Sequence, residues 1–208
     1  MAVIIDISTK DLDILAKRFR DSPDTIMFAT ISALNKSADM VKTALKREIR
    51  QLYAITDAEL SGKGGYKGFK SNNLITLRKA TKGNCSSKIE VRGSTLNLSR
   101  FLQSPKMPIS HKGLTMKQIK KIKTPSVRVL KGQTKRLAGT HTFVASVNGR
   151  NLIFERDGKS LKVLRTLSTA QMASNANVSR KVNELAKGII IKKVEQEIEF
   201  RLSKGFMR

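Results

Sequence analysis

The charged side chains are spread very unevenly along this chain of 208 residues, and this limits where a packed core can form. Residues 1–60 carry nine basic and nine acidic side chains, whereas residues 61–170 carry 24 basic and three acidic ones, a net charge of +21. Residues 171–208 add eight basic and four acidic side chains, which brings the chain to +25. Because unbalanced like charges repel one another, we expect the two ends to pack and the middle to need an anionic neighbour.

Within the middle segment, residues 63–136 contain one acid, Glu90. A stretch of this kind behaves as a solvated arm until an acidic partner neutralises it. We therefore expect residues 61–136 to form a basic loop or arm region with short strands, and the alternative is a solvated face without a specific partner. The side chains expected to contact a partner protein or DNA are Lys106, Lys112, Lys117, Lys120, Lys121, Lys123, Arg128, Lys131, Lys135 and Arg136.

The first 60 residues predict a helical hairpin. Apolar residues recur at spacings of three and four over residues 26–52, which is the pattern of an amphipathic helix. Ser22 is a candidate N-cap for this helix, and Pro23 suits its first turn. A shorter helix, capped by Ser8 or Thr9, is expected before it.

The end of the chain predicts a long closing helix, because apolar residues keep helical spacing from Val178 to Leu202. Gly188 lies inside this pattern, where glycine costs about 1 kcal/mol relative to alanine. We expect a bend or a close approach of another segment at that position.

Between the helices the pattern changes to the alternation of half-buried strands, at Ile89 and Val91, at Leu96 and Leu98, and at Val127 and Val129. The glycine-rich segment 61–72 predicts a loop, whose aromatic residues Tyr66 and Phe69 either stack on bases or anchor the loop to its own domain. Residues 103–124 contain two prolines and six lysines and predict a long loop or basic arm.

Residues 142–167 predict a three-stranded meander. Asn148-Gly149 provides a type I′ turn between strands at 142–147 and 150–156, because both residues tolerate a positive φ. Asp157-Gly158 then turns the chain into a third strand at 161–167. Helices at both ends around an antiparallel sheet give an α+β fold. We expect one domain made of residues 1–60, the basic region 61–136, and residues 137–208 with the meander and closing helix.

Few residues in the chain suit catalysis. Glu155 and Asp157 share one face of a strand, but Asp157 is better explained by its turn than by a metal ion. His111 and His141 lie beside no evident nucleophile, and Cys85 has no histidine at a motif spacing. We therefore expect no catalytic residue, no metal site and no cofactor. A phosphate-binding loop, zinc-finger spacing and a sequence-reading RNA signature are also missing from the sequence.

Targeting signals are not evident either. No apolar run approaches the roughly 18 residues that a membrane span needs, and the N-terminal residues do not resemble a secretory signal. One cysteine cannot form an internal disulfide, which fits synthesis in a reducing cytosol.

The meander and the residues after it carry a further pattern, at Phe143, Gly149, Phe154, Arg156, Gly158, Leu161, Gln171 and Met172. It resembles a pattern of the prophage minor tail protein Z family. In that family an F-V-A segment, a turn glycine, a V-F-x-R segment, x-G-K, a short strand and a Gln-Met pair precede a long terminal helix. Weaker similarity extends to residues 33–36, 77–80 and 98–101.

This resemblance implies a structural protein in the virion of a long-tailed bacteriophage, assembled in the host cytoplasm. It implies a tail-completion protein at the head-proximal end of the tail, without catalysis, and a homo-oligomeric ring for which six subunits is one expectation. The implied partners are the tail terminator, tail tube, tape-measure and head-tail joining proteins, and DNA in the tail channel, but no membrane. A free nucleic-acid-binding module that contacts phosphates is the rival hypothesis, and an enzyme acting on DNA is a third.

Overall fold

A computed structural model describes residues 2–7, 23–61, 74–105, 124–137 and 141–205 of the chain. The expected helix before residue 20 and its caps Ser8 and Thr9, the candidate cap Ser22, and the loop aromatics Tyr66 and Phe69 lie outside these ranges. The chain divides into two compact units, of which the first comprises Met1–Glu48, Leu74–Arg92 and Ala173–Arg208 and the second comprises Ile49–Asn73 and Gly93–Met172.

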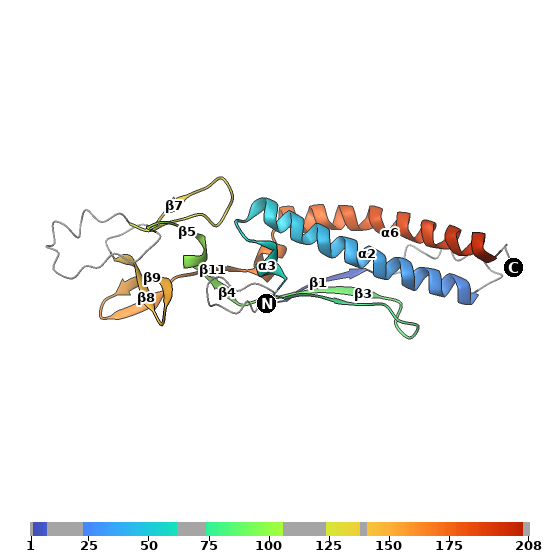
Figure 1. Ribbon diagram of the computed structural model, residues 1–208, viewed down its shortest axis with the longest axis horizontal. Coiled ribbons are helices and arrows are strands. Elements are labelled where there is room, and N and C mark those ends of the chain that lie inside the picture. The colour runs from blue at the N-terminus through green and yellow to red at the C-terminus, as the bar shows by residue number, and fades with distance from the viewer. Residues whose placement is uncertain (1, 8–22, 62–73, 106–123, 138–140, 206–208) are drawn as a thin grey trace. The chain divides into compact units, whose positions relative to one another are not determined.

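The first unit combines two long helices with a three-stranded antiparallel sheet (Figure 1). The sheet has the order β1-β3-β2, so that β3 lies between two strands that the sequence patterns did not predict. Ile89 and Val91 of β3 are fully buried, as their alternation predicted. The elements are β1 (Ala2–Ile7), α2 (Pro23–Leu52), β2 (Leu74–Arg78), β3 (Ser87–Arg92) and α6 (Ala176–Gly205).

The helices α2 and α6 of the first unit run antiparallel. Their contacts show this, since residues near the start of α2 pack against residues near the end of α6. Ala29 and Ala33 pack against Val194 and Ile198 in one buried cluster. Small side chains on α2 let the two backbones approach, and branched side chains on α6 fill the space between them. Both helices confirm the predictions made from their apolar spacing.

Of the two features expected at Gly188, a bend or a close approach of another segment, the structure bears on the close approach. A methyl group added at this glycine would meet nothing within 4 Å apart from the helix itself. Among the described residues, therefore, no other segment packs close to Gly188, and this glycine is exposed.

The second unit contains small antiparallel sheets and short helices. One sheet pairs β11 with β4, a second has the order β5-β6-β7, and a third has the order β10-β9-β8. The elements are α3 (Asp57–Leu60), β4 (Thr95–Asn97), the 3₁₀ helix η2 (Leu98–Phe101), β5 (Leu102–Ser104), β6 (Ser126–Val127), β7 (Lys135–Arg136), β8 (Thr142–Val147), β9 (Arg150–Asp157), β10 (Ser160–Val163), β11 (Arg165–Ser168) and α5 (Thr169–Ala173).

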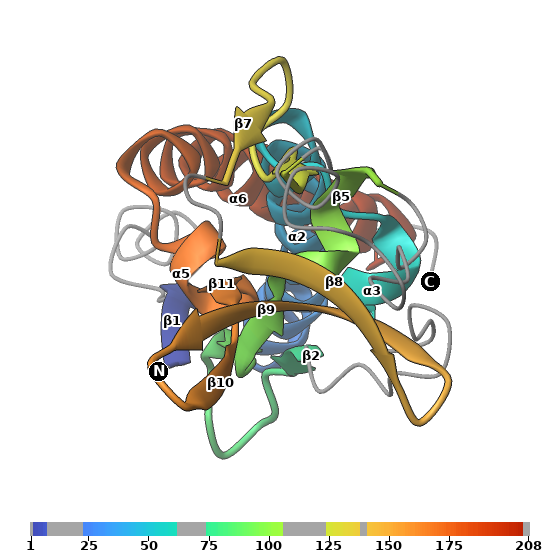
Figure 2. The same cartoon turned by 90° about the vertical axis from the view of Figure 1, so that its left-hand side faces the viewer.

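The predicted meander is present as β8, β9 and β10, which lie side by side in Figure 2. Asn148 and Gly149 have φ values of 51° and 72°, which is the positive backbone that a type I′ turn requires. The third strand ends earlier than predicted. After Val163 the chain leaves the meander, and Arg165–Ser168 pairs with β4 instead.

Two further boundaries differ from the sequence prediction. Leu98, expected in a strand, is the first residue of a 3₁₀ helix, although its N–H still bonds to the Leu164 carbonyl at 3.0 Å, next to the β4–β11 pairing. Gln103 and Ser104, expected in the long loop, belong to β5, which pairs with β6. The α+β class is confirmed, whereas the division into 1–60, 61–136 and 137–208 stays a prediction.

Candidate interaction surface

Residues 124–137, which include the end of the basic region, form a hairpin, which we call the basic hairpin. It pairs β6 with β7 in the register Ser126 to Arg136 and Val127 to Lys135. Val127 is buried, at 3% exposure, and anchors the hairpin in the second unit. Gly132 has a φ of 81° in the connecting loop, and the Arg128 Nε donates a hydrogen bond to the Thr134 hydroxyl at 3.2 Å.

Four cations of the predicted set lie on the basic hairpin, and all four are exposed. They are Arg128, Lys131, Lys135 and Arg136. The hairpin contains no acid, and among the described residues none of the four forms an ion pair. Lys106, Lys112, Lys117, Lys120, Lys121 and Lys123 lie outside the described ranges, as does His111.

Backbone hydrogen bonds attach the basic hairpin to neighbouring segments of its unit. The Lys131 N–H bonds to the Leu52 carbonyl at 2.9 Å, and the Val129 carbonyl accepts from the Ala54 N–H at 2.9 Å. The Arg128 N–H bonds to a carbonyl of η2 at 2.8 Å. Residues 124–136 were expected in a basic loop or arm region with short strands, and these bonds hold the segment against the end of α2 and η2. Their charge is therefore displayed on an ordered scaffold.

Four positions of the family-like pattern converge on one face of the meander. The register pairs Phe143 with Phe154 and Leu161 with Arg156, and successive residues of a strand alternate between faces. Phe143, Phe154, Arg156 and Leu161 therefore share a face, which we call the Phe154 face. The rings of Phe143 and Phe154 stack with centroids 5.9 Å apart.

The remaining positions of the pattern shape the backbone around the meander. Gly149 and Gly158 have positive φ values of 72° and 58° in its two turns. Gln171 closes a reciprocal cap at the start of α5, because the Ser168 N–H donates to its Oε1 at 2.8 Å while its own N–H donates to the Ser168 hydroxyl at 3.2 Å. Met172 is fully buried beside this cap.

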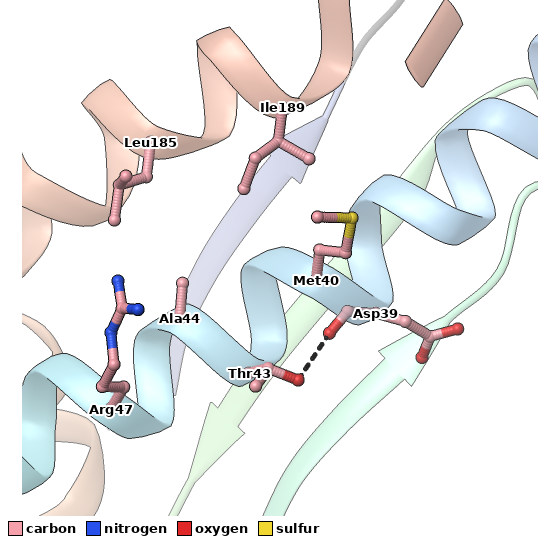
Figure 3. Close-up of a pocket in the computed structure, with 7 residues that line it drawn as sticks. All are labelled: Asp39, Met40, Thr43, Ala44, Arg47, Leu185 and Ile189. Atoms are coloured by element: carbon pink, nitrogen blue, oxygen red, sulfur yellow. Dashed lines mark hydrogen bonds between the residues drawn. The ribbon is translucent and has the colours of Figure 1, made fainter. Parts of the chain in front are cut away.

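A pocket of about 510 Å³ lies between α2 and α6 of the first unit (Figure 3). Leu185 and Ile189 of α6 face Met40 and Ala44 of α2 across it. Its two charged lining residues form ion pairs with residues that do not line the pocket, Asp39 with Lys79 and Arg47 with Glu48. Because no set of polar groups converges in this pocket, it offers apolar contact but nothing to orient a substrate.

The described residues that the sequence analysis considered for catalysis or metal binding do not gather at one place. His141 lies at the meander, where its carbonyl accepts the Arg156 N–H at 2.9 Å, and Cys85 lies in the turn between β2 and β3. Asp157 serves its turn, since its carbonyl accepts the Ser160 hydroxyl at 2.8 Å, and Glu155 stands opposite Thr142 and Lys162 in the sheet. Within the described ranges, no three His, Cys, Asp or Glu residues are grouped to hold a metal ion.

The sequence patterns missed the extent of the Phe154 face. Besides the residues of the family-like pattern, it includes Val147, Leu152 and Val163, and Val147 is 44% exposed. The signal was present in the segments F-V-A-S-V and L-I-F, which are apolar at consecutive positions rather than at alternate ones. When both the odd and the even positions of a strand are apolar, both faces of the strand are apolar, and other segments must cover each of them.

Comparison with known proteins gives one match. A family model described as prophage minor tail protein Z (GPZ) matches residues 21–207, which confirms the resemblance. No curated protein and no solved structure matches the chain. In the described part of the chain, no helix has the length and apolar character needed to cross a membrane. The chain belongs to the prophage minor tail protein Z family and is a structural component of a phage tail in the virion.

Proposed function

We propose that this chain is a tail-completion protein at the head-proximal end of the tail, where its copies form a ring. In this role it acts as a structural element and not as an enzyme. The ring contacts the tail terminator or the tube, with the tape-measure and head-tail joining proteins as further neighbours, and its basic side chains meet acidic protein surfaces or the DNA of the channel.

The observation that carries the proposal is the basic hairpin. Four exposed cations stand there without an acid, on a backbone tied to the rest of its unit. Unbalanced charge of one sign lowers stability until a partner supplies the opposite sign. A backbone that is already ordered also avoids the entropy cost of ordering this segment on binding. Both arguments favour a fixed contact with an anionic neighbour in an assembly.

Cross-linking mass spectrometry on purified virions tests the position. Lys131 and Lys135 of the basic hairpin, together with Lys117, Lys120, Lys121 and Lys123, are the reporting lysines. We expect links to proteins of the upper tail and links between copies of this chain. Links only to proteins of the distal tail would contradict the head-proximal position, and the lack of links between copies would contradict the ring.

A pair of matched double variants tests the role of the charge. The first variant, Lys131→Glu with Lys135→Glu, reverses the charge of two side chains on the basic hairpin. The second, Lys187→Glu with Lys192→Glu, makes the same change of charge at two exposed positions of α6. We expect only the first pair to lower the amount of protein recovered in tails. Equal recovery of both pairs would show that the hairpin charge is not used.

The same hairpin favours the second candidate, a free nucleic-acid-binding module. In that case duplex DNA of mixed sequence would bind the purified chain, and affinity would fall steeply with salt, by a log-log slope of about 0.9 for each phosphate contact. Gel filtration without nucleic acid separates the two. A discrete ring supports the tail protein, whereas a monomer that is absent from virions supports the module.

A further inference from the structure

The three-stranded sheet of the first unit has two open edges. In its order β1-β3-β2, the outer strands β1 and β2 both pair with β3 and, in the part of the chain that the structure describes, with no other strand. The strand order therefore leaves one side of each outer strand without a neighbouring strand. Such an edge is a template on which a further strand can pair, and proteins usually protect it.

Neither edge has the usual protection. The strands β1 and β2 are six and five residues long, which is ordinary for strands, and both ladders keep their register without a bulge. Neither strand contains proline or lysine, and each contains one charged residue, although 27% of the chain is charged. Leu77 of β2 is only half-buried, whereas Ile75 on the same face is 3% exposed. These features indicate that the edges are paired when the protein is in place.

A second copy of this chain fits both edges at once. Because β1 and β2 are both antiparallel to β3, they point in the same direction, and β1 of one copy can add to β2 of the next as a parallel strand. Repeating this contact pairs both edges of every copy, and a contact of this head-to-tail kind closes into a ring. A strand from another protein, or a two-fold pairing of β2 with β2, would leave β1 open.

The residues of the two edges match in one register. Across the sheet, Ile5 and Leu77 stand in one row on either side of β3, and Asp6 and Arg78 stand in the next. If the following copy continues these rows, apolar positions meet apolar ones and an acid stands beside a base. A slip by one residue would move the apolar set of β1 to the other face. The Arg78 Nε lies 3.2 Å from Glu90, but the arginine side chain is 70% exposed and has further N–H donors.

We propose that neighbouring copies join edge to edge, with β1 of one copy added in parallel to β2 of the next and Ile4 beside Thr76. Main-chain hydrogen bonds hold this contact, as in other cases of strand addition. The apolar and charged rows fix its register. This inference rests on the proposed function, because it specifies the contact through which the copies form their ring.

Disulfide trapping tests the contact. In the full chain with Cys85→Ser, the changes Ile4→Cys and Thr76→Cys place one cysteine on each edge. Within one chain both positions stand opposite Glu90, two strand spacings or about 9.6 Å apart, and cysteines whose Cα atoms are more than about 7 Å apart do not bridge. A disulfide therefore has to join two copies. We expect a ladder of linked chains on a denaturing gel without reductant, both from the oxidised purified chain and from oxidised tails.

The register has a matched control. Ile4→Cys with Arg78→Cys places the second cysteine on the same face of β2 but two residues away, and we expect much less ladder from it. A ladder of equal strength would overturn the register. Efficient dimers from Thr76→Cys alone would show that like edges pair, which contradicts a head-to-tail contact. No ladder from tails that contain the chain would overturn the inference and leave the proposed function standing, whereas absence of the wild-type chain from tails would contradict the proposed function itself.

Matched arginine variants, made in the chain with cysteines at 4 and 76, test the charged row. Arg78→Glu and Arg92→Glu each remove an ion pair with Glu90, at 3.2 Å and 2.8 Å, from an arginine whose side chain is 70% or 61% exposed. Only Arg78 stands on an edge strand, since Arg92 belongs to the central strand β3. We expect Arg78→Glu to lower the ladder yield about tenfold, because like charges then meet across the contact, and Asp6→Lys in the same chain to restore it. Equal yields from the two arginine variants would overturn the proposed register.

Discussion

Asn35 of α2 and the backbone of Ala80 are joined by two hydrogen bonds that run in opposite directions. The Ala80 N–H donates to the Asn35 Oδ1 at 2.7 Å, and the Asn35 Nδ2 donates to the Ala80 carbonyl at 3.1 Å. The buried Ser87 hydroxyl donates to the same Oδ1 at 3.0 Å. This contact joins residues 33–36 and 77–80, two of the three segments with weaker similarity to the family, and fixes the chain after β2 against the long helix.

Asn35→Ala tests this contact. The change leaves the carbonyl of Ala80, a residue only 4% exposed, without its side-chain donor, and removes the acceptor of the Ser87 hydroxyl. Leaving buried polar groups unsatisfied costs about 1–3 kcal/mol, so we expect a loss of about 2 kcal/mol in the free energy of unfolding. Urea denaturation measures it. Asn183→Ala, at an exposed position of α6, is the control, and an equal effect of both variants would contradict the role of Asn35.

Arg100→Met tests the buried ion pair of the second unit. The Arg100 Nη1 lies 3.4 Å from the Glu59 Oε1, and the two side chains are only 6% and 13% exposed. Removing the arginine leaves a carboxylate that is poorly hydrated and has lost this cation, a change that costs about 3–5 kcal/mol in buried pairs. We expect about 3 kcal/mol by guanidinium denaturation. Arg180→Met breaks an exposed pair with Glu184, where about 0.5 kcal/mol is expected.

Gly149→Ala tests the turn of the meander. Nothing lies within 4 Å of the added methyl group, so its effect comes from the backbone φ of 72° alone. The left-handed backbone region with positive φ costs any residue with a side chain about 1–2 kcal/mol. We expect a loss of about 1 kcal/mol in stability, measured by thermal unfolding.

Gly188→Ala is the matched counterpart, and its effect has the opposite sign. The added methyl group again meets open space, but Gly188 lies within α6, where alanine is favoured over glycine by about 1 kcal/mol. We expect the variant to unfold at a higher temperature than wild type. Destabilisation would mean that a segment outside the described residues packs against this position.

The ionisation of Glu197 makes the stability of the first unit depend on pH in the acidic range. Hydrogen bonding to the Lys36 ammonium is the main cause that lowers the pKa of the Glu197 carboxyl from its ordinary value of 4.5, and the Ser32 hydroxyl adds to it. A lowered pKa in the folded state means that the carboxylate stabilises the fold above pH 4.5 and that this contribution is lost as the pH falls through the folded-state pKa.

The variant Lys36→Met should therefore lose less stability than wild type as the pH falls below 4.5. Melting temperatures at neutral pH and in this acidic range measure the difference, with Lys192→Met as an exposed-lysine control on α6. An identical acid dependence in wild type and Lys36→Met would show that the ion pair is not the cause.

Part of the candidate surface was predictable from the sequence. The excess of cations in this segment could be read directly from the sequence, and in the structure the same side chains are exposed. They are Arg128, Lys131, Lys135 and Arg136. The attachment of the hairpin was not predictable from the sequence. The bonds from Lys131 to Leu52 and from Ala54 to Val129 join residues 79 and 75 positions apart, and no local sequence pattern encodes such a contact.

The sequence by itself determined the elements whose signals are local. Apolar spacing over 26–52 and 178–202 specified the two long helices, and Asn148-Gly149 specified a hairpin because its turn demands two positive φ values. Tertiary structure alone decided which surfaces are covered. β8 and β9 carry apolar residues on both faces, so their sequence fits either orientation, and only packing within the unit buried Ile153 of β9 and left Val147 of β8 exposed. Burial depends on what distant segments bring to a face, and that information is not contained in the strand itself.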